Sequence, residues 1–281
     1  MTPSLVHHLR VTPEDVLGNQ DRGRVFLIPG SPARARRIAD RLEDLRTCPS
    51  PRLHDVHLGV WRDGARTVDV GTVSTGMGCP SLGIIVTELI QVGVRRFLRV
   101  GSAGSLQGDR VPPGSLVIAT AAVRDEGTSD ACLPREVPAV AHPDWVEALV
   151  ATAREQGLAE RTFAGLVHSK DSFFGREMGH GPLGDVHRRY MAALAAAGVL
   201  ATEMEASHLF VLAAIHGPDV RPVGTPSCAP DVVQAGALLA VIGDEVGFVP
   251  DAHAARAEED AVSVALEAAW RLLAREEGRT P

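Results

Sequence analysis

Apolar runs of strand length alternate with longer amphipathic segments along most of the chain. The runs RVFLIP (24–29), TVDVGTVS (67–74) and RRFLRVG (95–101) are typical of buried strands. Two more strands are predicted at SLVIATAAV and TFAGLVHS, and helices at ARARRIADRLEDL, LGIIVTELIQVG, PDWVEALVATAREQG and DAHAARAEEDAVSVALEAAWRLLAREEG. This alternation predicts an α/β fold with helices on both faces of the sheet. Because no linker, repeat or low-complexity tract divides the chain, residues 1–281 are interpreted as one domain.

A glycine stands at the end of three predicted strands, at Gly30, Gly76 and Gly101. Ligands of α/β folds gather at the carboxyl ends of strands. Glycine also lets the backbone approach an anion closely. The three strand ends therefore predict one binding site.

Two arginines and a hydroxyl lie next to these strand ends. Arg34 follows Gly30 by one helical turn, and Ser102 lies on the turn after FLRVG. Arg99 lies inside FLRVG, where a buried guanidinium is costly unless it meets an anion. Because guanidinium groups match phosphate oxygens bidentately, these side chains predict an oxyanion pocket.

Composition narrows the classes of partner. The chain has 281 residues, 45% of them hydrophobic, and a net charge of -7, which disfavours a nucleic-acid surface. Lys170 is the only lysine in the sequence, so an arginine is informative only at a particular motif position. The four cysteines form no C-x-x-C motif, the first residues lack a signal-peptide core, and no apolar run reaches about 18 residues. We therefore expect a cytoplasmic protein with no membrane partner.

Common cofactor and metal motifs are incomplete. Gly76 and Gly78 resemble part of a dinucleotide fingerprint, but Ser81 replaces its third glycine. Neither a P-loop nor a G-x-S-x-G nucleophile elbow occurs. His54 and His57, if they share a helix face, lack a third metal ligand nearby. The sequence therefore predicts neither a cofactor nor a metal site.

The segment TEMEAS (202–207) allows two interpretations. Thr202, followed by Glu205 three residues later, has the pattern of a capping box at a helix start. Glu203 and Glu205 also place two carboxylates around Met204, which suits a polyol next to a flat ring. From this segment alone both interpretations stay open.

Six motifs occur in one order along the chain: His8-Leu9, VFLIPGSPAR, STGMGCPS, FLRVGSAGSL, KDSFFG and TEMEAS. In this order and spacing they resemble the nucleoside phosphorylase superfamily, most closely its uridine phosphorylase branch. The resemblance implies a single-domain three-layer α/β/α sandwich with a mixed central sheet. It also implies a pentosyltransferase with inorganic phosphate as co-substrate and no cofactor, built from homodimers into a hexamer with shared active sites.

The resemblance also implies roles for individual residues. The implied phosphate site consists of Gly30, Arg34, Arg99, Ser102 and, from a neighbouring subunit, Arg52. The implied ribose and base sites consist of Glu203, Met204, Glu205, a neighbour's His8, and Phe173 near the base. Catalysis is assigned to Arg99 and Glu205. Phosphate attacks C1′ through an oxocarbenium-like state while Glu205 holds the ribose hydroxyls, so capping becomes a second role for Glu205.

The base site departs from the uridine phosphorylase pattern. Arg176 stands where that branch has a glutamine, and Met178 where it has an arginine. Because a guanidinium cannot accept from uracil N3–H, we expect uridine to be a poor substrate unless Glu177 accepts instead. The segment taken to follow the last strand, GTPSCAPD, lacks the asparagine–arginine pair of the pyrimidine branch. Only Asp231 is available there as the aspartate that protonates N7 in the purine branch.

The leading interpretation is phosphorolysis of a pyrimidine-like or modified nucleoside to ribose 1-phosphate and a free base. The alternatives are a purine nucleoside phosphorylase, a nucleoside hydrolase of the same fold and a non-catalytic nucleoside-binding protein. Arg34, Arg99 and Ser102 disfavour the hydrolase, because a water nucleophile needs no anion pocket. The altered base segment keeps the binding protein open.

Overall fold

The computed structural model describes residues 6–222, 225, 229, 231–244, 247 and 251–276. The strands are β1 (Val25–Ile28), β2 (Glu43–Cys48), β3 (Val56–Asp63), β4 (Arg66–Thr72), β5 (Arg96–Ser105), β6 (Leu116–Asp125), β7 (Ala139–Val140), β8 (Thr162–Lys170), β9 (Ala201–Glu203) and β10 (Gln234–Gly243). The α-helices are α1 (Pro32–Ala39), α2 (Cys79–Gln91), α3 (Pro143–Glu155), α4 (Gly184–Ala196), α5 (Ala206–His216) and α6 (Asp251–Glu276). Three short helical turns are η1 (Ser129–Ala131), η2 (Ala159–Arg161) and the π-helical η3 (Phe173–Glu177).

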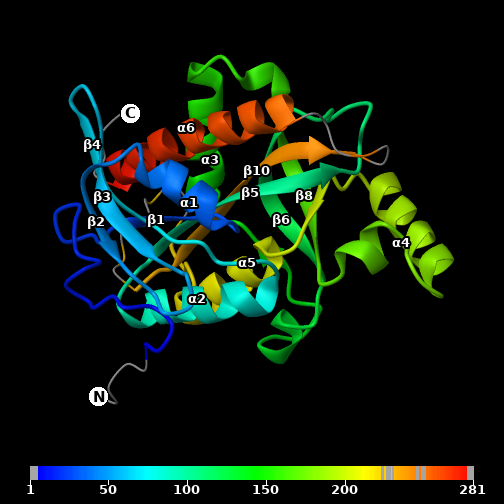
Figure 1. Ribbon diagram of the computed structural model, residues 1–281, viewed down its shortest axis with the longest axis horizontal. Coiled ribbons are helices and arrows are strands. Elements are labelled where there is room, and N and C mark those ends of the chain that lie inside the picture. Colours follow the sequence, from blue (N-terminus) through cyan, green and yellow to red (C-terminus); the bar gives the residue numbers. More distant parts are fainter. Residues whose placement is uncertain are drawn as a thin grey trace.

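One mixed sheet contains all of these strands. Its order is β10-β6-β8-β9-β5-β1-β4-β3-β2, with β7 paired to β6. The pairs β1–β5 and β5–β10 are parallel, whereas β6–β10 and β5–β9 are antiparallel. Because β10 pairs with both β5 and β6, the strands β5, β10, β6, β8 and β9 close into a ring, from which β1, β4, β3 and β2 extend (Figure 1). The predicted mixed sheet is confirmed, and its partial closure is an added feature.

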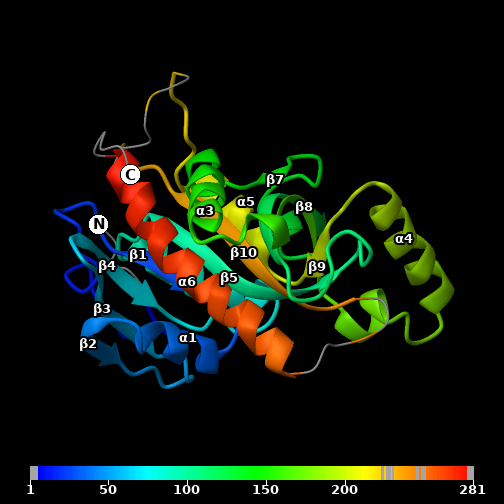
Figure 2. The same cartoon turned by 90° about the horizontal axis from the view of Figure 1, so that it is seen from above.

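Helices cover both faces of the sheet. The helices α2 and α5 lie on one face, and α1, α3 and α6 on the other (Figures 1 and 2). Along β1, Phe26 and Ile28 belong to the apolar cluster that includes α2 and α5, whereas Val25 and Leu27 pack in the cluster of α3 and α6. The uninterrupted apolar run of β1 therefore reflects two covered faces, and the predicted α/β fold is confirmed. None of the helices in the described ranges is long and apolar enough to span a membrane.

The first helix is shorter than predicted. α1 ends at Ala39, and residues 43–45 of the predicted helix lie in β2. The backbone N–H groups of Arg41 and Leu42 bond to the carbonyls of Ile38 and Ala39, which makes a tight turn. Since β2 pairs with β3 at the edge of the sheet, strand pairing overrides the local helical pattern.

Five of the described strands were not predicted: β2, β3, β7, β9 and β10. β3 contains His57, whose Nδ1 contacts Thr47 Oγ1 at 2.8 Å, so His57 lies in the sheet and not on a helix. β10 has the sequence QAGALLAVIG, and such a short apolar run does not distinguish a strand from a helix.

The last strand of the sheet is β10, which comes after GTPSCAPD in the sequence. The segment after it begins at Asp244, so the prediction that GTPSCAPD fills this place is wrong. Asp231 precedes β10 at the edge where Gln234 pairs with Arg96, the first residue of β5. Residues 224, 226–228 and 230 of GTPSCAPD lie outside the described residues.

Candidate active site

A cavity of about 280 Å³ lies at the carboxyl ends of β1, β5, β8, β9 and β10. The predicted site residues that line it are Gly30, Arg34, Arg99, Ser102, Phe173, Glu177, Glu203, Met204 and Glu205. The other lining residues are Ser31, Gly76, Met77, Ala103, Gly104, Lys170, Thr202 and Ile242. The convergence predicted at the strand ends thus occurs in one cavity.

The sheet order sets the order of the lining groups. Gly30 follows β1, Arg99 and Ser102 belong to β5, Glu203 ends β9, and Lys170 ends β8. These strands are consecutive neighbours in the order β1, β5, β9 and β8. The groups predicted for phosphate, at β1 and β5, therefore lie next to the ribose group of β9, and the predicted base residues lie in η3, which follows β8.

Arg99 is buried in the cavity wall, with 4% of its surface exposed. Its Nε donates to Glu203 Oε2 at 2.8 Å, and Nη2 forms an ion pair with Glu205. Burial opposes the charge of Arg99, but the carboxylates of Glu205 and Glu203 together raise its pKa above the ordinary value. The remaining nitrogen, Nη1, is buried and has no hydrogen-bond partner within the described residues. An unmade hydrogen bond of this kind is costly, which favours a polar ligand at this guanidinium.

Arg34 reaches the cavity from the first turn of α1. Ser31 caps this helix by accepting from the Arg34 backbone N–H at 3.1 Å, and proline occupies the first helical position. The guanidinium donates through Nη1 to the carbonyl of Val100 at 3.2 Å and through Nη2 to Glu258 of α6. Burial lowers the pKa of Arg34, against the opposing charge of Glu258. Its Nε is a second buried donor without a partner in the described structure.

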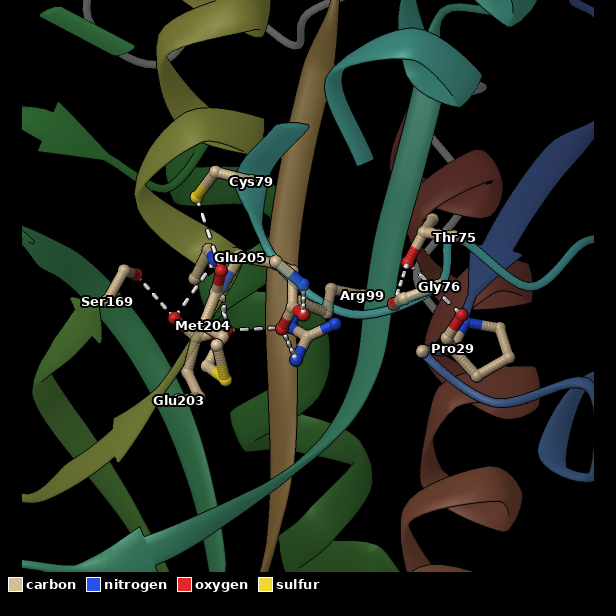
Figure 3. Close-up of polar contacts among 12 residues, drawn as sticks. Pro29, Thr75, Gly76, Cys79, Arg99, Ser169, Glu203, Met204 and Glu205 are labelled. Atoms are coloured by element: carbon tan, nitrogen blue, oxygen red, sulfur yellow. Dashed lines mark hydrogen bonds and ion pairs between the residues drawn. The ribbon is translucent and has the colours of Figure 1, made fainter. Parts of the chain in front are cut away.

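Two turns next to these arginines are tied together. Thr75 donates to the carbonyl of Pro29 through its N–H, at 2.9 Å, and through its hydroxyl, at 3.3 Å (Figure 3). Ser74 Oγ donates to the carbonyl of Gly30 at 2.8 Å. A Cβ on Gly30 would stand 3.3 Å from the carbonyl of Gly76, which itself has a φ of +74°. Only glycine fits this close approach comfortably, so the backbone of both turns stays open toward the cavity.

Glu203, and not Glu205, caps α5. The helix begins at Ala206, and the Glu205 side chain makes no capping bond. The Glu203 carboxylate accepts from the backbone N–H groups of Glu205 and Ala206, at 2.8 and 3.0 Å, in addition to its bond from Arg99. The capping box predicted for Thr202 and Glu205 is therefore wrong, because Thr202 belongs to β9 and Glu203 takes over the helix terminus.

Glu205 is thereby free to face the cavity. Its Oε1 accepts from the backbone N–H of Gly78, the N-cap residue of α2. A helix N-terminus favours a negative group, and Arg99 pairs with the other oxygen, Oε2. Burial raises the pKa of the Glu205 carboxyl, and the charge of Glu203 acts in the same direction, against Arg99. In Figure 3, Arg99 stands between this carboxylate and the turns at Pro29 and Gly76.

The opposite end of the cavity is formed by β8 and η3. Lys170, at the end of β8, is 1% exposed, and its Nζ lies 2.7 Å from Glu177 Oε2. The Phe173 ring centroid lies 5.9 Å from the same Nζ. Ser172 caps the start of η3 by accepting from the N–H of Gly175 at 3.1 Å. A π-helical turn is rare and is often found at functional sites.

Arg176 lies outside this cavity. Its Nε and Nη2 contact Asp125 Oδ2 and Oδ1 at 2.7 and 3.0 Å, and its guanidinium lies 4.4 Å from the ring centroid of Tyr190. It lines a neighbouring polar cleft together with His187. The prediction that Arg176 repels uracil N3–H assumed that Arg176 faces the base, and this is not the case. The next residue, Glu177, lines the cavity instead.

His8 and Arg52 also lie outside the cavity of their own chain. Ser50 Oγ donates to the carbonyl of His8 at 2.7 Å and accepts from the N–H of Arg52 at 3.1 Å. The His8 ring contacts Glu88 through Nδ1 at 2.7 Å. The two residues are thus neighbours, and their donation to another subunit stays a prediction.

Three residues at or near the site were not predicted to act there. Lys170 could have been predicted from the sequence, because it is the only lysine and stands at a strand end, close to the phenylalanines of KDSFFG. Glu258 could not have been predicted, because its contact with Arg34 joins the last helix to the first and depends on the tertiary fold. Asp244 does not line the cavity itself; it follows β10, one of the strands that were not predicted, two residues after Ile242, which does.

Comparison with known proteins agrees with this geometry. Residues 24–269 match the family described as the phosphorylase superfamily. A uridine phosphorylase of Haemophilus influenzae is 34% identical over 95% of this chain and 98% of its own. A uridine phosphorylase of Salmonella typhimurium is 33% identical over 97% and 100%, and a guanosine phosphorylase of Halorubrum lacusprofundi is 35% identical over 80% and 80%. The chain belongs to the phosphorylase superfamily, which confirms the relationship predicted from the six motifs.

Proposed function

We propose that this protein is a nucleoside phosphorylase, which uses inorganic phosphate to cleave an N-glycosidic bond and releases ribose 1-phosphate and a free base. The observation that carries this proposal is a pair of buried guanidinium nitrogens, Arg34 Nε and Arg99 Nη1, that have no hydrogen-bond partner among the described residues. Both arginines line the cavity that also contains Glu205. An anion site next to a carboxylate for sugar hydroxyls is the arrangement that phosphorolysis requires.

Phosphate is assigned to the end of the cavity formed by β1 and β5. Arg34 and Arg99 bind its oxygens there, together with the Ser102 hydroxyl and the open backbone at Gly30. Glu203 holds Arg99 in place through its 2.8 Å contact with Nε. The arginines thereby orient the nucleophile before the reaction begins.

The ribose is assigned to the middle of the cavity, over β9. Met204 packs against the ring, and Glu205 accepts from the 2′- and 3′-hydroxyls. A phosphate oxygen attacks C1′ while the C1′–N bond breaks and its electron pair passes to the base. The intermediate sugar is oxocarbenium-like, and the Glu205 carboxylate stabilises its positive charge through the hydroxyls.

The proposed assembly is a homodimer, with three dimers forming a hexamer. A dimer axis would bring His8 and Arg52 of one subunit to the cavity of the other, where they would bind ribose and phosphate. The adjacency of the two residues through Ser50 supports this, because one surface then supplies both. The small-molecule partners are a nucleoside and phosphate, and a cytoplasmic location stays a prediction.

The leading substrate is a pyrimidine-like or modified nucleoside, and a purine nucleoside is a second candidate. Asp244 follows the last strand, where the purine branch is expected to have the aspartate that protonates N7. It comes two residues after Ile242, which lines the cavity. The similarity to a guanosine phosphorylase points in the same direction. If purines are the substrates, Asp244→Asn lowers kcat for inosine and leaves uridine unaffected.

One assay separates the proposed function from its alternatives. Base release is measured with and without phosphate for uridine, thymidine, cytidine, inosine and adenosine, and the sugar product is identified. A phosphorylase requires phosphate and forms ribose 1-phosphate. A hydrolase releases free ribose at the same rate in both buffers. A non-catalytic binding protein binds nucleosides in calorimetry and releases no base.

A further inference from the structure

We propose that the Lys170–Glu177 ion pair reads the edge of the base and selects bases that have a ring N–H beside a carbonyl. Such a lactam edge occurs in 4-oxopyrimidines and 6-oxopurines, and is absent from their amino-substituted counterparts. The inference rests on the proposed function and deepens it, because it names the substrate class of the same site.

The pair has the right place in the cavity. Lys170 ends β8, two strands from β5, which carries Arg99 in the phosphate end. The ribose groups of β9 lie between these strands, so a base attached to C1′ extends toward β8 and η3. Phe173 lines the same end and offers a ring face for stacking. Lys170 and Glu177 are therefore where the edge of a stacked base arrives.

A chain of hydrogen bonds holds the lysine. Lys170 Nζ lies 3.0 Å from Thr202 Oγ1, which lies 2.9 Å from His168 Nδ1. The other ring nitrogen, His168 Nε2, lies 2.9 Å from the carboxylate of Asp125. An ionised carboxylate only accepts, so Nε2 carries a proton, and in the neutral imidazole Nδ1 then accepts from the Thr202 hydroxyl. The threonine oxygen is then left to accept from Lys170.

Arg176 anchors the far end of this chain. Its two contacts with Asp125 fix the carboxylate that orients His168. Arg176 is thus a positioning residue for Lys170, which gives it a function although it lies outside the cavity. The only lysine of the sequence is therefore supported by a buried polar chain and not by a chance contact.

The carboxylate of Glu177 is seated against the backbone of β5. A Cβ at Gly104 would stand 2.8 Å from Glu177 Oε1, so any side chain there would displace the carboxylate. The other oxygen, Oε2, is the one that pairs with Lys170 at 2.7 Å. Gly104 therefore leaves the space in which an acceptor stands next to the lysine donor.

A donor next to an acceptor matches a lactam edge. The Lys170 ammonium donates to the base carbonyl. This bond replaces the 3.3 Å bond from Lys170 to the backbone carbonyl of Glu203, which is the longest of the lysine's hydrogen bonds. The Glu177 carboxylate accepts from the adjacent ring N–H. In cytosine or adenine the order is reversed, so an amino group faces the ammonium and an unprotonated ring nitrogen faces the carboxylate. Two mismatches in a buried site reject such a base strongly.

The first test compares matched nucleosides at saturating phosphate. We expect kcat/KM for uridine over cytidine, and for inosine over adenosine, to differ by at least about 100-fold. Lys170→Met and Glu177→Gln should each lower this ratio about tenfold or more. Arg135→Met removes a cation from the neighbouring cleft and should leave the ratio unchanged. Thermal denaturation shows whether each variant is folded. If Lys170→Met does not fold, the test relies on Glu177→Gln.

The second test measures binding of free bases and does not depend on turnover. Uracil, cytosine, hypoxanthine and adenine are titrated in the presence of phosphate. Tighter binding of the two oxo bases, lost in Lys170→Met or Glu177→Gln, supports the inference even if no nucleoside is cleaved. Equal or tighter binding of the amino bases, no binding of any base, or an oxo preference unchanged in the variants overturns it. Phosphate-dependent cleavage combined with any of these results would leave the proposed function intact.

Discussion

Glu258, on the last helix, binds the guanidinium of Arg34, on the first. The same carboxylate also pairs with Arg37. One of the two arginines assigned to phosphate is thus already neutralised by an anion from within the protein. Phosphate and Glu258 therefore compete for Arg34, and Arg37 can retain Glu258 when phosphate displaces it.

Replacing Glu258 with glutamine is expected to lower KM for phosphate roughly fivefold to tenfold, because the competing contact loses its charge. The measurement is initial rate against phosphate concentration at saturating nucleoside. Glu259→Gln is the matched control, since this neighbouring carboxylate pairs with Arg41 and does not line the cavity. A higher KM for phosphate in Glu258→Gln would mean that the carboxylate orients Arg34 instead of competing for it.

Arg99→Met should lower kcat/KM by at least about two orders of magnitude, since a charge-assisted contact in the transition state is lost. The variant also removes the positive charge that Arg99 places next to two buried carboxylates, Glu203 and Glu205. Arg96→Met is the control, because Arg96 is equally buried on the same strand but pairs with Glu276 outside the cavity. It is expected to lose stability and retain kcat/KM. Comparable turnover by the two variants would contradict the role of Arg99.

Mixing two inactive variants tests whether subunits share sites. Subunits with His8→Ala and subunits with Glu205→Ala are each expected to be inactive. Random pairing should restore about a quarter of wild-type activity, because half of the dimers are mixed and each contains one intact site. Differently tagged subunits, recovered together, show that mixed assemblies have formed. No recovery of activity in such assemblies would place His8 outside the partner's site, and Arg52→Ala can be paired in the same way.

The acid stability of the protein should depend on Glu88. Burial opposes its charge, but bonds from the His8 side chain and from the backbone N–H groups of His7, Leu9 and His8 hold the pKa of Glu88 below its ordinary 4.5. A folded-state pKa below the unfolded one means that this stabilisation is present above about pH 4.5 and is lost as pH falls through the folded pKa.

Glu88→Gln is therefore expected to be less stable than wild type at pH 7, and the two should converge only as the pH falls below the folded-state pKa of Glu88, which itself lies below 4.5. Urea unfolding at a series of pH values gives the difference in free energy of unfolding. A difference that stays constant with pH would show that the carboxylate charge contributes nothing.

Local sequence patterns determined the framework of this protein. The apolar run of β1 and the turn at Gly30 could be read directly, because a buried strand and a close backbone approach each require particular residues over a few positions. Arg99 was informative for the same reason, since a guanidinium inside a buried strand needs a partner wherever the strand lies. These are short-range requirements, and the structure confirms the mixed sheet and brings Gly30 and Arg99 to one cavity.

Only the tertiary structure decided which of two chemically similar or adjacent side chains enters the cavity and which takes a structural role. Glu203 and Glu205 have the same chemistry, and only the start of α5 at Ala206 makes the first a cap and leaves the second in the cavity. Arg176 and Glu177 are adjacent, and the π-helical turn sends one to Asp125 and the other to Lys170. Partners such as Glu258 come from distant segments. Local propensities extend over only a few residues, whereas burial and charge pairing depend on what the folded chain brings within a few ångströms.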